Sequence, residues 1–174
     1  MERVTIRPIT NKDTDNIVLW RNNPQVLGNF IDRNRLTKEI HETWIHTKIE
    51  KDLVRQFIIV VGNNDVGTIY LRDIDKENQK AEYGIFIGLD EYLGRGIGSE
   101  AGKLILDYAF LEMKLNKVFL RVLANNNRAI ESYKKIGFVE DGKFRQEVKI
   151  EGFFWDVIFM SILSSEWPKL QSSA

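Results

Sequence analysis

Apolar residues recur along this chain with two spacings, and the two spacings predict different elements. Runs rich in β-branched and aromatic residues predict strands at residues 4–8, 56–61, 66–71, 81–88, 118–122, 145–150 and 154–163. Apolar residues three and four positions apart predict helices at 38–51, 98–113 and 128–136, and polar residues 11–15 are typical caps for a helix that carries Trp20. The order predicts an α/β (α+β) fold, a mixed central sheet of about seven strands with about four helices on its faces.

Length and charge narrow the class of protein. The 174 residues contain no interdomain linker, so we expect a single domain over residues 1–174, with a frayed tail at about 168–174. Because 25 basic residues balance 25 acidic ones, no net field favours nucleic acid or a membrane as a partner. The sequence has no cysteine, no apolar run that could cross a bilayer and no leader-like start, so we expect a cytoplasmic protein.

The sequence has few histidine or cysteine residues that could bind a metal or act as a covalent nucleophile. His41 and His46 lie on the predicted helix 38–51 at a spacing that turns their rings apart, and we expect both to be solvated. No cysteine nucleophile exists, and no serine has the setting of an activated nucleophile. We therefore expect no metal site and no covalent intermediate.

A glycine-rich segment, EYLGRGIGSEA at residues 91–101, lies between a predicted strand and a predicted helix. Gly94, Gly96 and Gly98 occupy alternate positions in it. Free N–H groups and the helix dipole make such a helix start an anion site, and missing side chains let a phosphate approach. The alternative is a merely flexible turn. The position before an amphipathic helix favours a phosphate-bearing ligand.

Two ordered motifs resemble the GNAT superfamily of N-acetyltransferases, over nearly the whole chain. Residues 93–98 resemble its pyrophosphate loop Q/R-x-x-G-x-G/A, and residues 126–138, NNRAIESYKKIGF, resemble N-x-x-A-I-x-x-Y-x-x-x-G-F. The branch includes ribosomal-protein alanine, polyamine and amino-sugar acetyltransferases. Leu93 replaces the family's Gln or Arg, which removes about one hydrogen bond, of order 1 kcal/mol, from a site that uses mostly backbone donors.

The resemblance implies a GNAT-like fold that binds acetyl-coenzyme A (acetyl-CoA) as co-substrate. It assigns cofactor binding to Phe86, Ile87, Gly94, Arg95, Gly96, Ile97, Gly98, Ser99 and Asn126. The pantetheine arm would follow the strand that ends at Ile87, where a backbone N–H would stabilise the developing oxyanion. Asn126 would bind the pantetheine or, alternatively, cap the helix that follows it.

Direct attack of an amine on a thioester needs a proton acceptor and a proton donor. Glu82, on the predicted strand 81–88, is our candidate acceptor, directly or through water; the alternative is a carboxylate on a solvent face. Tyr133 falls at the family's tyrosine, and we expect it to be the general acid. It would otherwise hydrogen-bond the sulfur or pack as an ordinary aromatic residue.

The first helices should bind the acceptor, a small-molecule or peptide amine, and Trp20, Arg21 and Asn22 are the candidate substrate-binding residues. Residues 11–56 hold seven acidic and eight basic side chains, so no acidic funnel favours a polyamine. Arg21, Arg33 and Arg35 would suit the phosphate of a nucleotide-linked amino sugar. A protein N-terminus is the other acceptor we expect, and a polyamine remains the alternative.

Three further interpretations stay open. Residues 96–101 also match a dinucleotide fingerprint, but the loop 89–95 precedes it and no acidic residue ends the next predicted strand. A non-catalytic acetyl-CoA sensor with the same fold is a second alternative. The aromatic residues 153–155 and Phe159 belong to the core or, alternatively, to a homodimer interface.

Overall fold

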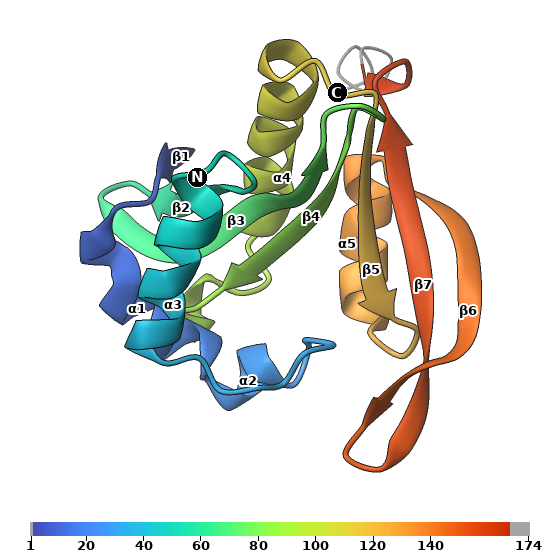
Figure 1. Ribbon diagram of the computed structural model, residues 1–174, viewed down its shortest axis with the longest axis horizontal. Coiled ribbons are helices and arrows are strands. Elements are labelled where there is room, and N and C mark those ends of the chain that lie inside the picture. The colour runs from blue at the N-terminus through green and yellow to red at the C-terminus, as the bar shows by residue number, and fades with distance from the viewer. Residues whose placement is uncertain (1, 168–174) are drawn as a thin grey trace.

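The computed structural model describes residues 2–167 and contains one mixed sheet of seven strands in the order β1-β2-β3-β4-β5-β7-β6 (Figure 1). The strands are β1 Val4–Pro8, β2 Arg55–Val61, β3 Asn64–Asp75, β4 Lys80–Ile87, β5 Lys117–Leu123, β6 Val139–Ile150 and β7 Phe153–Leu163. The α-helices are α1 Thr14–Arg21, α2 Pro24–Leu27, α3 Lys38–Trp44, α4 Ile97–Asp107 and α5 Asn127–Ile136. The predicted α/β class and mixed seven-stranded sheet are confirmed.

The helices differ from the prediction in two ways. The α2 turn was not predicted; Pro24 stands at its first position, where no N–H is needed, and the Asn23 side chain accepts a hydrogen bond from the Gln25 N–H. Helices α3 and α4 each pass into a π-helical turn, Ile45–Ile49 and Tyr108–Glu112, before they end. The predicted frayed tail, 168–174, lies outside the described residues.

The continuous apolar run of β2 is explained by burial on both faces of the sheet. Ile59 belongs to the core that α4 covers, whereas its neighbour Ile58 packs against Ile17 and Trp20 of α1. Successive strand residues therefore contribute to two separate cores. Figure 1 shows α4 and α1–α3 on opposite sides of the strands.

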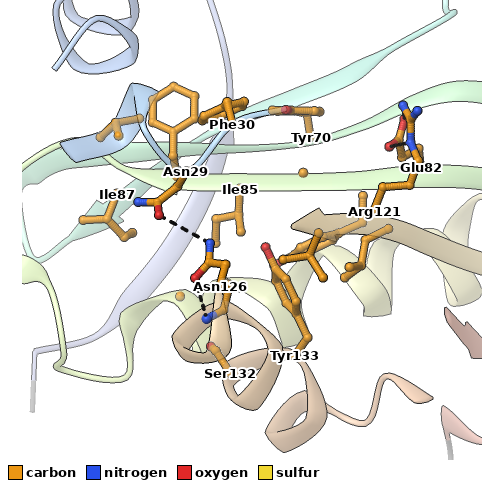
Figure 2. A pocket seen from close by; sticks show the side chains of 18 of the residues that line it. Asn29, Phe30, Tyr70, Glu82, Ile85, Ile87, Arg121, Asn126, Ser132 and Tyr133 are labelled. Carbon is orange, nitrogen blue, oxygen red and sulfur yellow. Dashed lines mark hydrogen bonds and ion pairs between the residues drawn. The ribbon is translucent and has the colours of Figure 1, made fainter. Parts of the chain in front are cut away.

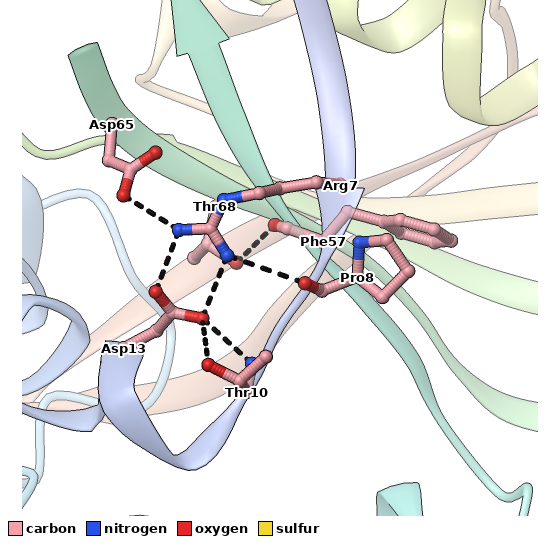
Figure 3. A network of polar contacts seen from close by, with 7 residues as sticks. All are labelled: Arg7, Pro8, Thr10, Asp13, Phe57, Asp65 and Thr68. Atoms are coloured by element: carbon pink, nitrogen blue, oxygen red, sulfur yellow. Dashed lines mark hydrogen bonds and ion pairs between the residues drawn. The ribbon is translucent and has the colours of Figure 1, made fainter. Parts of the chain in front are cut away.

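An arginine network joins β1 to the start of α1 (Figure 3). Arg7 donates to both carboxylate oxygens of the buried Asp13, at 2.8 and 3.0 Å, and to Asp65 at 2.6 Å. Asp13 also accepts a hydrogen bond from the Thr10 N–H. Burial alone would raise the pKa of Asp13, but these partners outweigh it and lower the pKa. The network thereby places α1 against the sheet.

His41 corrects one expectation. His46 is exposed, as predicted, but His41 is 3% exposed and its Nδ1 lies 3.0 Å from the Thr14 hydroxyl. The fold brings α1 against that face of α3, and the apolar periodicity of α3 alone did not show which polar residue would face α1.

Among the strands of residues 2–167, β4 and β5 form the only parallel pair, and this pair is short. The strands pair at Lys80–Lys117, Ala81–Val118 and Glu82–Phe119, after which no pairing follows. β5 instead continues along β7 to Leu123, while β4 continues along β3 to Ile87. The two central strands therefore separate after Glu82 (Figure 1).

We predict that Gly88→Ala destabilises the fold by about 1–3 kcal/mol because overpacking a tight core forces side chains to shift. A Cβ at Gly88 would lie 2.1 Å from Cγ of Trp20, which is 3% exposed. Gly142→Ala is the control, since a Cβ there meets only the Phe144 ring at 4.0 Å. Urea denaturation measures both variants, and equal losses of stability would contradict the prediction.

Candidate active site

A cleft of about 1340 Å³ occupies the space where β4 and β5 separate. One wall is β4 from Glu82 to Ile87, and the other is β5 from Leu120 to Val122 together with α5. The loop after α2 also lines the cleft, and there the Asn126 amide donates to the Asn29 side chain at 3.4 Å (Figure 2). The cleft is long enough to be lined by both the glycine loop and the first helices.

The edge of β4 that faces the cleft carries backbone hydrogen-bonding groups. Gly88 donates its N–H to Val66 of β3 at 2.8 Å, and Ile87 pairs with Gly67 in the same register. Because backbone groups alternate in direction along a strand, those of Ile85 and Ile87 point away from β3. They point towards the side that β5 has left, so the wall of the cleft presents N–H and C=O groups.

Two of the three glycines are required by backbone conformation. Gly94 and Gly96 have φ of 76° and 78°, in the left-handed region, and a Cβ on either would meet nothing within 4 Å. A Cβ on Gly98 would make an ordinary contact with Ile85 at 3.7 Å, and its φ is not positive. The first two glycines therefore shape the loop and leave the space beside it open.

The loop ends at the N-terminus of α4, as the sequence predicted. Gly96 caps the helix, and its carbonyl accepts from the N–H groups of Ser99 and Glu100. The N–H groups of Ile97 and Gly98 precede the first helical bonds, so they have no acceptor within the helix. Together with the helix dipole they form a site for an anion.

Not every residue of the predicted loop lines the cleft. Ile97 lines the cleft, but its side chain is 3% exposed and belongs to the main core, so its backbone is what a ligand could use. Arg95 is exposed and lies over the Tyr92 ring at 5.4 Å, outside the residues that line the cleft. The structure thus gives Arg95 a contact with Tyr92 that lies outside the cleft.

Tyr133 points into the cleft from α5 (Figure 2). Its ring packs edge-on against Tyr83 and Phe138, with centroid distances of 5.9 and 6.0 Å. Burial raises the pKa of Tyr133, with a smaller contribution from Tyr70, so the phenol stays protonated at neutral pH. Tyr133 is thus a packed aromatic residue that lines the cleft, and its role as proton donor stays a prediction.

Asn126 fulfils the capping role. Its side-chain oxygen accepts from the Ala129 N–H at 3.2 Å at the start of α5, while its amide reaches Asn29. It also lines the cleft, so its side chain both starts α5 and joins the two sides of the site.

Glu82 is buried, not on a solvent face. Its oxygens accept from Arg121 Nε at 2.8 Å and from Arg72 Nε at 2.9 Å, and the residue is 3% exposed. Burial alone would raise the pKa of Glu82, but the hydrogen bonds and charges of Arg121 and Arg72 outweigh it and lower the pKa. The carboxylate lines the cleft but is a weak proton acceptor.

The three candidate acceptor residues separate in the structure. Trp20 is 3% exposed in the core of α1, and Asn22 exchanges hydrogen bonds with the backbone of Leu36, so neither lines the cleft. The predicted placement of these two residues is therefore corrected. The Trp20 side chain is packed in the core beneath α1, and the Asn22 side chain is bonded to the loop at Leu36. Arg21 does line the cleft, with its guanidinium 3.8 Å from the centre of the Phe30 ring.

Sequence reasoning missed the polar residues of the neighbouring strands. Tyr70 and Arg72 alternate on β3 opposite Gly84 and Glu82 of β4, so their side chains share one face. The β3–β4 hairpin could have indicated this register. Asn29 and Phe30 carried no such signal, because the path of the loop after α2 depends on tertiary packing.

The described residues contain neither a metal-binding group of side chains nor a membrane-spanning helix. Residues 2–167 hold no group of three or more His, Cys, Asp or Glu side chains arranged to bind a metal. Over the same residues, no helix is both long and apolar enough to cross a membrane.

Comparison with known proteins gives one consistent family. Residues 3–139 match the acetyltransferase (GNAT) domain. The chain is 28% identical to spermidine N(1)-acetyltransferase of Escherichia coli (strain K12) over 168 residues, 94% of this chain and 88% of the relative. It is 29% identical to the "Putative ribosomal N-acetyltransferase YdaF" of Bacillus subtilis over 174 residues, with coverages of 95% and 94%.

A solved structure agrees. Spermidine N-acetyltransferase from Vibrio cholerae in complex with CoA and spermine superimposes with a TM-score of 0.89 at 28% identity, covering 95% of this chain and 98% of that one. The separated central strands, the glycine loop at the start of α4 and these matches show that the chain belongs to the GNAT family and is an acetyl-CoA-dependent N-acetyltransferase.

Proposed function

We propose that the enzyme transfers the acetyl group to a primary amine by direct attack while both substrates are bound. One observation carries the proposal: a single cleft is lined at one end by the glycine loop and at the other by Arg21 and Arg72. Two substrates can therefore meet beside β4 without a covalent enzyme intermediate. Acetyl-CoA supplies an activated acyl group, and the residues of the chain position it.

The loop residues would hold the diphosphate of acetyl-CoA. The N–H groups of Ile97 and Gly98 point out of α4, and the open space beside Gly94 and Gly96 lets an anion approach. The inward backbone groups of Ile85 and the carbonyl of Ile87 would hold the pantetheine amides, as they would a partner strand, which leaves the N–H of Ile87 for the thioester. Leu93 adds no donor, so the grip depends on the backbone.

The reaction then follows from the groups in the cleft. The amine nitrogen forms a bond to the thioester carbon, and the carbonyl oxygen becomes an oxyanion that the N–H of Ile87 would stabilise. The carbon–sulfur bond breaks as the tetrahedral intermediate collapses, and Tyr133 would give its proton to the leaving sulfur. The proton of the amine leaves to water, and the Tyr133 phenolate takes up a proton from water, which restores the phenol for the next turnover.

We propose a positioning role for Glu82. Two arginines occupy its oxygens and lower its pKa, which makes direct proton abstraction unfavourable. The same contacts hold Arg72 and Arg121 at the walls of the cleft. Water in the cleft would accept the amine proton, so Glu82 acts through the groups it orients.

The acceptor differs among the relatives. A polyamine is the second candidate, since the relatives named above include spermidine acetyltransferases. A protein N-terminus and a nucleotide-linked amino sugar are the others. The predicted homodimer and cytoplasmic location stay predictions; the relatives include a dodecameric spermidine N-acetyltransferase, and Phe153 and Phe154 are exposed on β7.

Replacing Gly96 by Ala should weaken acetyl-CoA binding at least tenfold, because a Cβ would enter the open space beside the loop and strain the backbone by about 1–2 kcal/mol. Gly152→Ala is the matched control: its φ is 89°, its Cβ would also meet nothing within 4 Å, and it lies in the β6–β7 turn. Calorimetry gives both dissociation constants, and a similar loss in the two variants would remove the loop from the cofactor site.

Tyr133→Phe should lower kcat by roughly 100-fold, the usual contribution of a positioned general acid, with the acetyl-CoA dissociation constant within about twofold. Thiol release measures the rate. The control is Tyr108→Phe, which removes a hydroxyl bonded to Arg55 at 3.1 Å and away from the cleft. An unchanged kcat in Tyr133→Phe would exclude Tyr133 from the reaction.

The pH dependence provides a separate test. Tyr133 acts in its protonated form, and burial raises its pKa above the ordinary tyrosine value of about 10. At saturating substrates kcat should therefore not fall between roughly pH 7 and 10 through loss of this proton. A decline in that interval that is absent from Tyr133→Phe would show that the phenol ionises earlier and contradict the assignment.

A further inference from the structure

A second chamber of about 400 Å³ opens from the cleft on the side of α1 and α3. The two cavities share the wall residues Arg21, Phe30, Asp32, Trp44, Tyr70, Arg72 and Phe86. The chamber lies away from the glycine loop, whose residues line only the larger cleft. A molecule with its amine beside β4 could therefore extend a second group into it.

The charges of this chamber are unbalanced. Its walls include Arg21, Arg35 and Arg72 but only one carboxylate, Asp32, whose Oδ1 accepts from the Asn34 N–H at 2.9 Å. Glu82 lines the larger cleft but not the chamber, and both its oxygens are already bonded to arginines. Among the described wall residues, positive charge therefore exceeds negative charge.

Among the wall residues, Arg21 gives the strongest indication of a binding site. Its Nη2 donates to the Asp32 carbonyl at 2.5 Å and its plane covers Phe30, but its Nη1 is buried with no hydrogen-bond partner among the described residues. A buried cationic donor without a partner is costly, so such groups usually meet an anion. Burial lowers the pKa of Arg21, consistent with a charge that lacks compensation.

A second buried polar atom in the chamber, on His41, also has no hydrogen-bond partner among the described residues. His41 lines the chamber, its Nδ1 lies beside Thr14, and its Nε2 is buried without a partner. Four such side-chain atoms occur among the described residues, and two of them belong to walls of this chamber. Polar atoms of this kind in a cavity are typical of groups that bind a ligand or ordered water.

The remaining walls are aromatic. Phe30 meets Phe86 edge-on at 5.6 Å, and Trp44 and Tyr70 complete the lining. Aromatic faces beside guanidinium groups suit a planar or sugar-like body that carries an anion. A linear polyamine would instead place ammonium groups next to Arg21 and Arg35, an arrangement of like charges, since the charge of Arg72 is paired with Glu82.

We propose that this chamber binds an anionic group, a phosphate or a carboxylate, of the amine acceptor, with Arg21 as the central contact and Arg35 and Arg72 beside it. The assignment rests on the proposed N-acetyltransferase function and adds the class of acceptor. It selects nucleotide-linked amino sugars and peptides with a nearby carboxylate over polyamines.

The test uses the whole chain saturated with CoA, so that no probe can bind at the glycine loop. Calorimetry measures uridine diphosphate glucosamine as the phosphate probe, trialanine as the carboxylate probe and spermidine as the polyamine. Glucosamine and trialanine amide are the matched probes without the anion. At least one anionic amine should bind about tenfold more tightly than its matched neutral probe and than spermidine.

Variants then assign the contact. Arg21→Gln should weaken binding of that anionic amine at least tenfold and raise its KM, while the CoA dissociation constant stays within about twofold, which also shows that the variant folds. Arg35→Gln, at an exposed residue of the chamber, should weaken it severalfold in the same direction. Arg145→Gln, on exposed β6 and outside both cavities, is the control.

The outcomes separate the two proposals. Tighter binding of spermidine, no anionic amine above its neutral match, or equal binding by wild type and Arg21→Gln would each overturn the anion site while leaving acetyl transfer intact. Failure to bind CoA, or no thiol release with any amine, would overturn the proposed function and this assignment with it.

Discussion

The shape of the cleft depends on the ion pairs of one buried carboxylate, that of Glu82. Glu82 is the last residue of β4 that pairs with β5, and it binds Arg72 of β3 on one side and Arg121 of β5 on the other. A buried carboxylate is tolerated only when its oxygens are well satisfied, and removing one partner commonly costs 3–5 kcal/mol. These ion pairs connect β3, β4 and β5 at the point where the hydrogen-bond ladder between β4 and β5 ends. Beyond them, β4 is free to present its edge to a ligand.

The two ends of the cleft offer a ligand different physical means of binding. At the glycine loop, the available groups are the main-chain N–H groups and the dipole of α4, which need small residues but no particular side chain. This explains how Leu93 can stand where the family carries a polar residue. At the other end, side chains decide: the charge and packing of Arg21 and its neighbours are properties of individual residues. On the proposed function, the cofactor end would tolerate side-chain substitution, whereas the acceptor end would change its preference with the side chains that line it.

Tyr133 shows how packing and chemistry combine. Its ring is held by Tyr83 and Phe138, and these contacts both orient the hydroxyl and raise its pKa by burial. A raised pKa makes the phenol a weaker acid but keeps it protonated at neutral pH. As the proposed proton donor, Tyr133 would therefore depend on its position in the cleft and not on a high acidity.

The sequence alone determined the local features of this protein. Strand runs, the glycine loop before α4, the cap at Asn126 and the motif around Tyr133 all depend on residues close in the chain. The structure has them at the predicted places, except that β3 and β6 are longer than predicted and span 64–75 and 139–150. Tertiary structure decided the rest. Trp20 and Asn22 turned away from the cleft, Glu82 became an ion-pair centre and His41 was buried, because each depends on which distant element packs against it. Periodicity predicts that a face is covered, but only the fold of the whole chain decides what covers it.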